Sequence, residues 1–317
     1  MKPRTKSVLI LLAVGLVWGA EYPTIRWAVG TMDSIAFTAV KFLLSAAALL
    51  PLALRQAGPL PQNFRGKAPG RFFWCWAGLV TGVVLALETV FLYEGMVSTN
   101  AGKAAFIANM EVIVVLLIAI SIGRVPGHPI WLGLALGVAG MWLLSDPENG
   151  GAGWFNFGDA LVLASAVFGG LHVVLTGRYA NRVALYRFVT VQLAVTGFIC
   201  LTVTVARGTL PDAAAFWLTL PCAMFGIFSL SGAVVAQTAA QRHMRAVEVA
   251  LLLLLEAVFA AIIGAIFLNE GMTFVMCLGA AMMMAGAAVA QIHEGRKGER
   301  NAVPPHAMGE AEAAGTP

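Results

Sequence analysis

The chain has 317 residues, of which 59% are hydrophobic and only 11% are charged, and its mean hydropathy is +0.83. Roughly a quarter of the residues of a soluble domain are charged, so this composition excludes an ordinary soluble globular protein and predicts an integral membrane protein. The formal net charge of +4 reflects the membrane topology described below and gives no reason to expect nucleic acid as a partner.

Apolar stretches follow one another along nearly the whole chain. Each is close to the about 20 residues that a helix needs to cross a hydrocarbon core of about 30 Å. Lipid leaves a spanning backbone no hydrogen-bond partner except itself, so all of them are expected to be helices. The sequence thus predicts an all-α integral membrane protein with ten transmembrane helices, at residues 7–29, 34–54, 72–95, 101–122, 129–145, 158–177, 185–206, 214–240, 246–268 and 272–292.

The two ends of the chain are interpreted differently. The first apolar stretch is longer than the apolar region of a signal peptide and is not followed by a convincing cleavage site, so it is expected to stay in the protein. Residues 294–317 contain Gly, Glu, Pro and Ala without apolar periodicity and are expected to form a disordered cytoplasmic tail.

The cysteines all fall inside apolar stretches and are interpreted as small buried hydrophobes, and no cofactor or metal is expected.

The cations collect in alternate connections between the predicted helices. With the N-terminus inside, the inside segments hold 16 of the 20 Lys and Arg. The outside connections are short or acidic, as at Asp33, Asp146 and Asp212. The positive-inside rule therefore predicts that both termini are cytoplasmic. We expect a multi-pass protein of a bacterial cytoplasmic (inner) membrane, with the lipid bilayer as its surroundings.

The chain contains an internal repeat. The stretch "NAGKAAFIANMEVIVVLLIAI" stands 145 residues before "RAVEVALLLLLEAVFAAIIGA", which places Glu111 opposite Glu256. The match continues into the next predicted helix, where "WLGLALGVAGMW" corresponds to "CLGAAMMMAGAA". The aligned glycines are Gly133 and Gly140 in the first half and Gly279 and Gly286 in the second.

Each half of the chain therefore holds five predicted helices. The first repeat covers residues 1–146 and the second covers residues 158–293, joined by a Gly-rich outside linker at residues 147–157. Because five is an odd number, the second repeat is expected to be inverted in the membrane relative to the first. Many secondary transporters use such inverted repeats to alternate access to a central site.

Several stretches carry a family resemblance. "GLVWGAEYPTIRWAV", "VKFLLSAAALLPLAL" and "STNAGKAAFIANMEVIVVLLIA" are similar to the first, second and fourth helices of EamA-type members of the drug/metabolite transporter superfamily. The resemblance extends over residues 7–292 and implies a ten-helix metabolite transporter. Where that family usually has Arg-Phe in its second helix, this chain has Lys41 and Phe42. The family also commonly has proline after the positions of Glu111 and Glu256, whereas this chain has no proline there to interrupt the helix.

Two carboxylates are predicted near the middle of the membrane. Glu111 and Glu256 each lie about ten residues, or roughly 15 Å, into their predicted helices. A charge at that depth costs on the order of 3 kcal/mol or more, so each is a candidate functional residue. The alternative is a buried structural pair, because matched positions of an inverted repeat meet near its pseudo-two-fold axis and can share a proton or a partner. The sequence leaves both interpretations open.

Other ionisable residues also fall within the predicted helices. Glu88 and Glu21 have no acidic counterpart in the repeat, an asymmetry that favours a functional role. Lys41 enters the membrane from the outer end of the second helix. Lys103 lies near the outer boundary, where it can either extend to the interface or neutralise an acid across a cavity. For Glu94 and Glu248 we expect extension to an interface.

Aromatic side chains accompany Glu21. Trp18 and Tyr22 either pack in the interfacial belt or present their ring faces to a cation. The full set of candidate substrate-binding or coupling residues is Trp18, Glu21, Tyr22, Lys41, Glu88, Tyr93, Lys103, Glu111 and Glu256. These candidates contain more acids than bases, and the arginine clusters lie in cytoplasmic connections. The substrate is therefore expected to carry an amine, as amino acids do, in preference to an anion.

The sequence as a whole predicts a secondary transporter that exports small amphiphilic metabolites by rocking its two halves about a central cavity. Glu21, Glu88 or Glu111 can carry a coupling proton. No ATP-binding loop and none of the hydrolase motifs sought is present, so no enzyme is expected, and His172 is interpreted as a polar group packed between helices. A flippase for a lipid-like substrate stays open as an alternative, and a membrane-embedded enzyme or a structural membrane subunit is less favoured. Both a monomer and a homodimer stay open.

Overall fold

The computed structural model describes residues 3–29, 31–56, 72–96, 98, 101–144, 156–267 and 272–302, and within these ranges the chain is helical with no β-strand. The helices are α1 (Pro3–Val29), α2 (Ser34–Arg55), α3 (Phe73–Met96), α4 (Ala101–Ala108), α5 (Glu111–Ser121), α6 (His128–Leu144), α7 (Phe157–Tyr179), η1 (Ala180–Arg182), α8 (Leu185–Arg207), α9 (Ala213–Ile227), the π-helix η2 (Phe228–Gly232), α10 (Ala233–Ala240), α11 (Ala246–Leu253), α12 (Leu255–Phe267) and α13 (Phe274–Ala302).

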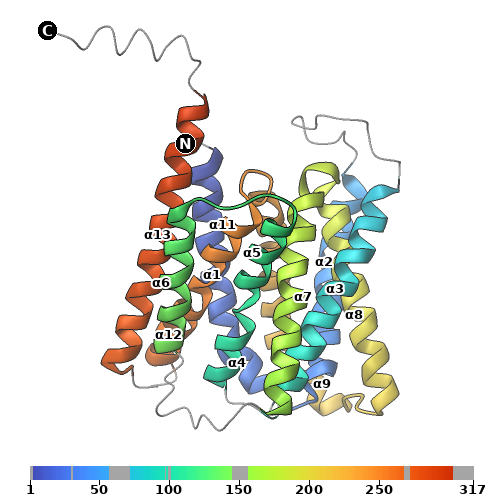
Figure 1. Ribbon diagram of the computed structural model, residues 1–317. Coiled ribbons are helices and arrows are strands. Elements are labelled where there is room, and N and C mark those ends of the chain that lie inside the picture. Colours follow the sequence, from blue (N-terminus) through green and yellow to red (C-terminus); the bar gives the residue numbers. More distant parts are fainter. Residues whose placement is uncertain are drawn as a thin grey trace, which may run out of the picture.

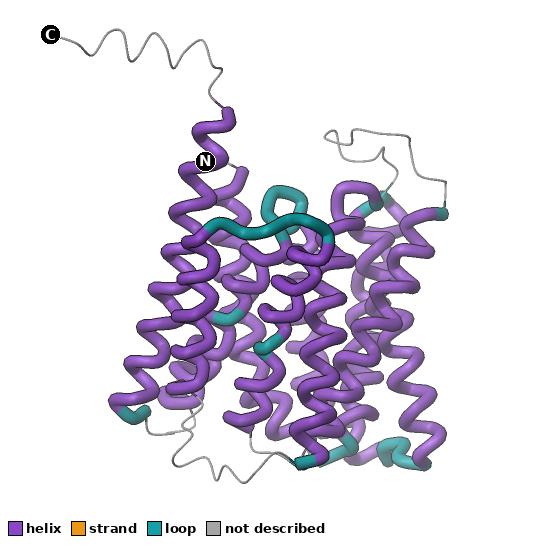
Figure 2. Tube along the Cα trace, in the orientation of Figure 1, coloured by secondary structure: helices purple, strands orange, loops and turns teal. Residues whose placement is uncertain are grey.

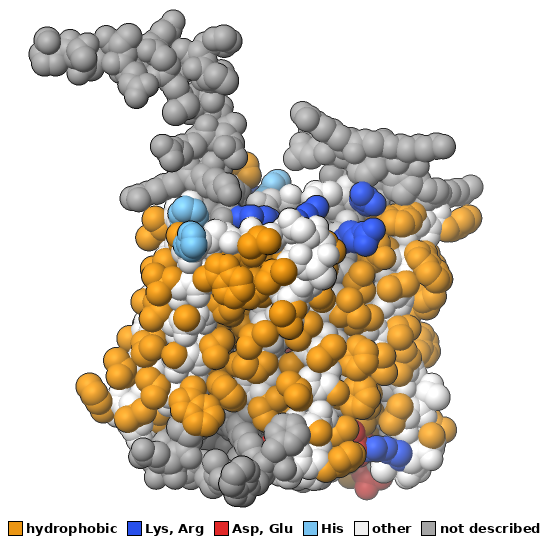
Figure 3. Space-filling view, in the orientation of Figure 1, with side chains coloured by type: hydrophobic (Ala, Val, Ile, Leu, Met, Phe, Trp, Pro, Cys, Tyr) orange, Lys and Arg blue, Asp and Glu red, His pale blue; other side chains and the backbone are white. Residues whose placement is uncertain are grey.

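Eight described segments are long and apolar enough to cross a membrane, and two shorter apolar helices, Phe106–Ser121 and His128–Leu144, fall where two further spans are predicted. Leu, Val, Phe and Trp side chains lie exposed along the bundle, with Phe228 75% and Trp217 67% exposed. Figure 3 shows hydrophobic side chains over the visible face, with Lys and Arg gathered at one end. Apolar side chains turned outward are the arrangement expected of a protein whose surroundings are lipid.

The helices form two bundles, and each bundle mixes the two halves of the chain (Figure 1). We call them the α1 bundle, in which α1 packs on α11 and α12 while α6 packs on α13, and the α2 bundle, in which α2 and α3 pack on α7, α8 and α9. The bundles are in contact through α5, which packs on α7 and α11, and through α1, which also packs on α9, η2 and α10. Residues 1–146 and 158–293 are therefore interleaved, with helices of both halves in each bundle.

Two helices are interrupted inside the bundle even though neither contains the expected proline. Helix α4 ends at Ala108 and α5 begins at Glu111, and α11 ends at Leu253 just before α12 (Figure 2). At both places short i→i+3 backbone bonds replace the α-helical pattern: Val112 N donates to Asn109 O at 3.3 Å, and Ala257 N donates to Leu254 O at 3.3 Å. The interruptions occur at matched positions of the repeat, directly beside Glu111 and Glu256.

Matched glycines of the repeat bring α6 and α13 into close contact. A Cβ atom on Gly133 would lie 2.7 Å from the carbonyl oxygen of Gly286, and one on Gly140 would lie 2.5 Å from that of Gly279. In the repeat, Gly133 corresponds to Gly279 and Gly140 corresponds to Gly286. Gly133 therefore contacts the counterpart of Gly140, and Gly140 contacts the counterpart of Gly133, as expected of a contact with two-fold symmetry. Small residues at such positions let helix backbones approach closely in a membrane, where packing drives helix association.

Asp and Asn side chains cap the N-termini of several helices. Asp33 Oδ1 accepts hydrogen bonds from the backbone N–H groups of Ile35 and Ala36 at the start of α2, and Asp212 Oδ1 accepts one from Ala215 at the start of α9. Asn156 and Asp159 form a capping box on α7. These caps satisfy backbone donors that the first turn of a helix leaves unpaired, so several acids of the predicted outside connections serve helix termini.

The C-terminal helix is longer than the sequence predicts. Helix α13 continues to Ala302, beyond residue 294, where the disordered tail is expected to begin. Charged helix-forming residues extend an existing helix easily because its nucleation has already been completed. Residues 303–317 and most of the predicted linker at 147–157 lie outside the described residues.

Ion pairs tie helices together at both ends of the bundle. Arg207 makes a two-pronged contact with Glu94 at 2.6 and 2.8 Å, linking α8 to α3. Glu248 is only 1% exposed and pairs with Arg4 and Arg245, each at 2.9 Å. The expectation that Glu248 extends to an interface was therefore wrong, because arginines from α1 and from the start of α11 reach it inside the protein.

We predict that Gly140→Ala destabilises the protein, because its Cβ would collide with the α13 backbone. Overpacking of this kind costs about 1–3 kcal/mol, so the melting temperature of the purified protein in a fixed detergent should fall. Gly177→Ala is the matched control, since a Cβ there meets no atom within 4 Å and alanine favours a helix by about 0.5–1 kcal/mol. Equal melting temperatures for the two variants would show that α6 and α13 can move apart to accept the extra methyl group without loss of stability.

Candidate functional site

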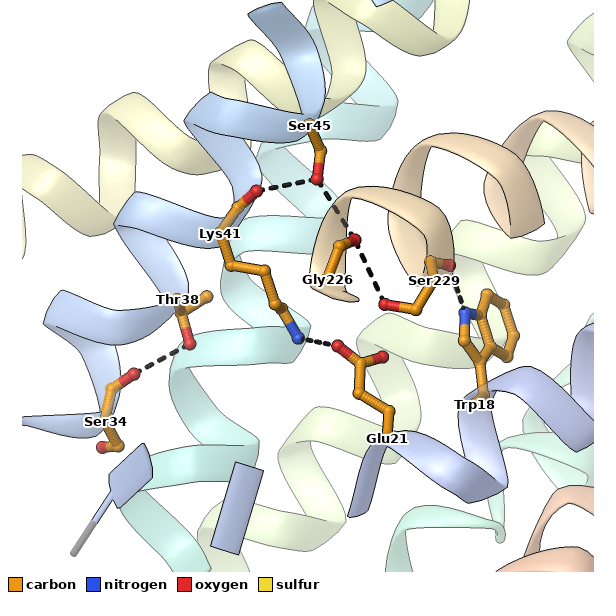
Figure 4. A network of polar contacts seen from close by, with 8 residues as sticks. All are labelled: Trp18, Glu21, Ser34, Thr38, Lys41, Ser45, Gly226 and Ser229. Atoms are coloured by element: carbon orange, nitrogen blue, oxygen red, sulfur yellow. Dashed lines mark hydrogen bonds and ion pairs between the residues drawn. The ribbon is translucent and has the colours of Figure 1, made fainter. Parts of the chain in front are cut away.

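A buried ion pair joins the two bundles. Lys41 Nζ on α2 donates a hydrogen bond to Glu21 Oε1 on α1 at 2.5 Å, and the side chains are 4% and 8% exposed (Figure 4). Removing two charges from water costs several kcal/mol per ion, and only a close partner repays this cost. The pairing of these two candidates was not foreseen, because residues 20 apart on different helices meet only once the helices have packed.

Room for Lys41 comes from a glycine on α9. A Cβ atom on Gly226 would overlap the aliphatic chain of Lys41, so only glycine leaves space for the lysine at this crossing. The Lys41 ammonium also lies 5.9 Å from the centroid of the Phe37 ring. Tyr93 on α3 lies within electrostatic reach of Lys41 and Glu21 and close to Thr38. The candidates Glu21, Lys41 and Tyr93 therefore belong to one polar cluster.

Trp18 is anchored by the π-helix. Its indole Nε1 donates a hydrogen bond to the backbone oxygen of Ser229 at 2.8 Å, and the two residues are shown together in Figure 4. A π-helical turn leaves backbone carbonyls available that an α-helix would use, and such turns are frequent at functional sites. Two hydrogen bonds join α2 to this region: Ser45 Oγ donates to Gly226 O near the end of α9, and Ser231 Oγ of the π-helix donates to Ser45 O.

Three carboxylates converge where the bundles meet. A Cβ atom on Gly169 of α7 would lie 2.6 Å from Glu111 Oε2 and 3.3 Å from Glu88 Oε1, so both side chains reach the same piece of backbone. Glu88 is also within electrostatic reach of Glu256 on α12. The sequence gives Glu88 no acidic counterpart in the repeat. The structure places Glu88 near both members of the repeat-related pair, Glu111 and Glu256. We call Glu88, Glu111 and Glu256 the carboxylate cluster.

Histidine and glutamine extend this cluster in a way that sequence reasoning missed. His172 Nδ1 lies 3.8 Å from Glu88 Oε2, and His172 Nε2 lies 2.6 Å from the amide nitrogen of Gln192. Both side chains are buried, so His172 is packed between helices as expected but is linked to Glu88 and to α8. The available signal was Gln192 itself, a polar side chain in the middle of an apolar stretch.

Two candidates cannot be placed in the site. The side chains of Tyr22 and Lys103 lie outside those that the structure describes, although their backbones belong to α1 and α4. The remaining candidates fall into two groups, the cluster around the Lys41–Glu21 pair and the carboxylate cluster. Among the described residues no group of three or more His, Cys, Asp or Glu has the geometry of a metal site.

Both halves of the sequence match one known protein family. Residues 5–146 and residues 156–291 each match the model of the EamA-like transporter family. The chain belongs to this family. The EamA fold therefore occurs twice in the protein, and the predicted resemblance to the drug/metabolite transporter superfamily is confirmed.

Relatives of this EamA-family protein carry the same broad description. It is 24% identical over 287 residues to an uncharacterized transporter of Archaeoglobus fulgidus, covering 89% of this chain and 84% of that protein. It is 29% identical over 151 residues to an uncharacterized transporter of Synechocystis sp., but that match covers 47% of this chain and only 42% of the relative. A solved structure, titled only as a protein crystal structure, has a TM-score of 0.73 at 19% identity and covers 92% of this chain and 98% of its own. Family and relatives together support a multi-pass membrane protein that transports a small molecule, and the solved structure shows the shared fold.

We predict that Lys41→Met alone strongly destabilises this EamA-family protein, whereas Glu21→Gln combined with Lys41→Met does not. Removing one member of a buried pair leaves the other charge without its partner and costs about 3–5 kcal/mol, while replacing both is often nearly neutral. Thermal unfolding of the purified variants would measure the difference. If the double variant were as unstable as the single one, packing of the lysine stem and not its charge would explain the loss.

Proposed function

We propose that the protein is a secondary transporter that exports small metabolites carrying an amine, most simply amino acids or related amines, by alternating access to the region between its two bundles. The observation that carries this proposal is the convergence of Glu88, Glu111 and Glu256 from α3, α5 and α12. Like charges that share a site away from water require a counter-ion or a proton. A substrate ammonium group supplies such a counter-ion.

An inverted repeat of ten transmembrane helices is part of the proposal. The reciprocal contacts of Gly133 with Gly286 and of Gly140 with Gly279 support a two-fold relation between antiparallel helices. The helix interruptions beside Glu111 and Glu256 fall at matched positions and support the same relation. Residues 1–146 and 158–293 are then the two repeats, and the carboxylate cluster lies where they meet.

The orientation and location follow from the charges. The N-terminal end of α1 and the C-terminal end of α13 lie at the same end of the bundle, where Lys and Arg gather in Figure 3. A cytoplasmic position for this end satisfies the positive-inside rule. We therefore propose that both termini face the cytoplasm and that the protein resides in a bacterial inner membrane.

Protons are the proposed coupling ions, held by the carboxylate cluster. Glu88 and Glu111 approach the same glycine, so a proton on one of them relieves their repulsion when no substrate amine is present. Amine and proton then occupy the cluster in turn, which couples export of one to entry of the other. His172 Nδ1 lies 3.8 Å from Glu88 Oε2, beside the proposed coupling site.

We predict that proteoliposomes containing the wild-type protein take up a radiolabelled amine or amino acid, and that an imposed pH gradient accelerates uptake. The panel would consist of amino acids, polyamines and nucleosides. Glu88→Gln, Glu111→Gln and Glu256→Gln should each lower the rate about tenfold or more, because hydrogen bonds to charged groups contribute about 1.5–3 kcal/mol. Glu94→Gln, which alters an exposed pair at the periphery, is the control.

Two outcomes would contradict separate parts of this proposal. If uptake ignored the pH gradient and all three cluster variants behaved as the wild type, proton coupling through the cluster would be rejected. If nucleosides were transported and amines were not, the substrate class would be wrong although the protein would still be a carrier.

Adjacent glycines on α7 allow a sharper test of the cluster. Gly169→Ala places a methyl group against the flexible ends of Glu111 and Glu88, whereas Gly170→Ala places one 2.7 Å from Val114 Cβ and 2.9 Å from the Glu111 backbone oxygen. We predict that Gly169→Ala slows transport while the melting temperature changes little, and that Gly170→Ala chiefly lowers the melting temperature. Normal transport by well-folded Gly169→Ala protein would show that the carboxylate positions are not critical.

A further inference from the structure

A chain of polar side chains runs from the carboxylate cluster into the α2 bundle. Glu88 of α3 lies beside His172 of α7, His172 contacts Gln192 of α8, and Thr81 on α3 lies 3.3 Å from Gln192 Oε1 through its Oγ1 atom. His172 is 6% exposed, and Gln192 and Thr81 are fully buried. Bulk water does not reach these groups freely, so their hydrogen-bond partners must come from the protein.

The structure holds this chain in one of two possible arrangements. The Gln192 amide nitrogen lies 2.6 Å from His172 Nε2, so Nε2 accepts and the proton of a neutral imidazole lies on Nδ1. Nδ1 lies 3.8 Å from Glu88 Oε2, a buried oxygen that has no hydrogen-bond partner in the described part of the chain. The gap exceeds a hydrogen bond by roughly 0.6 Å, which rotation of the glutamate side chain can close. In this arrangement His172 offers an N–H group to a carboxylate.

The opposite arrangement satisfies the same atoms. The Thr81 hydroxyl lies 2.8 Å from the Ala77 carbonyl oxygen, to which it can donate while its own oxygen accepts from the Gln192 amide. With the amide reversed, Gln192 Oε1 accepts from an Nε2–H group of His172. The bare Nδ1 can then accept the O–H group of protonated Glu88. His172 carries one proton in both arrangements and stays uncharged.

We propose that Glu88, His172 and Gln192 form a reversible hydrogen-bond relay, in which His172 offers an N–H group to the Glu88 carboxylate and a bare nitrogen to protonated Glu88. This inference rests on the proposed function and deepens it, because it names the positioning residues for the coupling proton. When the relay reverses, the pair of Glu88 and His172 gains one proton from solution. Glu88 is then protonated, the imidazole proton has moved from Nδ1 to Nε2, and the charge of the pair has changed from minus one to zero.

The acidic groups around the relay lie on its cluster side. Glu111 on α5 approaches the same glycine of α7 as Glu88, and Glu256 on α12 lies within electrostatic reach of Glu88. On α8 the group that faces the histidine is the uncharged amide, and Glu248 on α11 is already paired with arginines. Helix α4 contributes Lys103, whose side chain lies outside those described. A test must therefore separate the effect of Glu88 from that of Glu111.

The test is nitrogen NMR of the full-length protein in lipid bilayers, with ¹⁵N-labelled histidine and a series of pH values. Protonated and bare imidazole nitrogens give distinct ¹⁵N signals, and those of His172 are assigned by their loss in His172→Asn. We predict one proton on His172 throughout, on Nδ1 at high pH and on Nε2 at low pH. Glu88→Gln removes the titrating partner and should abolish this reversal, whereas Glu111→Gln should retain it.

Two variants of α8 test the inner end of the relay. Gln192→Leu should move the Nε2 signal of His172, because it removes the amide that contacts this nitrogen. Thr196→Val is the matched control, since it removes a neighbouring bond from α8 to Gly82 O of α3 without touching the relay, and it should leave the His172 signals unchanged. In proteoliposomes, uptake driven by a pH gradient should fall about tenfold in Gln192→Leu, as expected for loss of one buried hydrogen bond, and stay within about twofold in Thr196→Val.

The relay would be overturned if His172 carried two protons, or if the same nitrogen stayed protonated at every pH at which the protein remains folded. Either result, combined with amine uptake that depends on the pH gradient and on Glu88, would leave the proposed function standing without the relay. The converse result is also distinct. If His172 reversed together with Glu88 but no compound of the panel were taken up, the hydrogen-bond relay would be supported and the proposed function would be rejected.

Discussion

The cost of placing charge away from water governs this structure. Glu21 and Lys41 meet at 2.5 Å inside the protein, and Glu248 lies almost fully buried between two arginines. The Lys41–Glu21 and Arg4–Glu248 pairs join different helices, so these contacts also help to fix which helices are neighbours, whereas Arg245 reaches Glu248 from the start of the same helix. The carboxylate cluster is different, because Glu88, Glu111 and Glu256 gather like charges. In the proposed function, a proton or a substrate amine compensates the repulsion between Glu88 and Glu111, which approach the same glycine.

Interleaving of the two halves changes how transport must be understood. Helices α1 and α6 of the first half pack on α12 and α13 of the second, while α2 and α3 pack on α7 and α8. A rigid motion of one half would break nearly all of these contacts. The two bundles are themselves in contact through α5, through the Lys41–Glu21 pair and through α1, which packs on α9, η2 and α10. Under the proposed alternating access, these charged residues lie where the two bundles meet.

The helix interruptions show how tertiary structure can replace a sequence signal. The chain has Val112 and Ala257 where proline would be expected after Glu111 and Glu256, yet the helical pattern breaks at both positions. Close packing of α7 on α5 through Gly170 and of α1 on α12 through Gly19 constrains the backbone next to each glutamate. Each interruption leaves the carboxylate at or near the start of a new helix, where partial positive charge from the backbone favours it.

The class of protein, its helical nature and its internal repeat could all be predicted from the sequence. These properties follow from hydropathy, segment length and spacing, which are local to the chain. The structure alone decided which charges meet: Lys41 with Glu21, Glu88 with the repeat-related glutamates, and Glu248 with Arg4 and Arg245. It also decided that the halves interleave and that a π-helix holds Trp18. Such contacts depend on the rotation and partner of each helix, and ten apolar stretches with polar residues on several sides are compatible with many packings. Glycine contacts and charge compensation select one of them only when all the helices are present together.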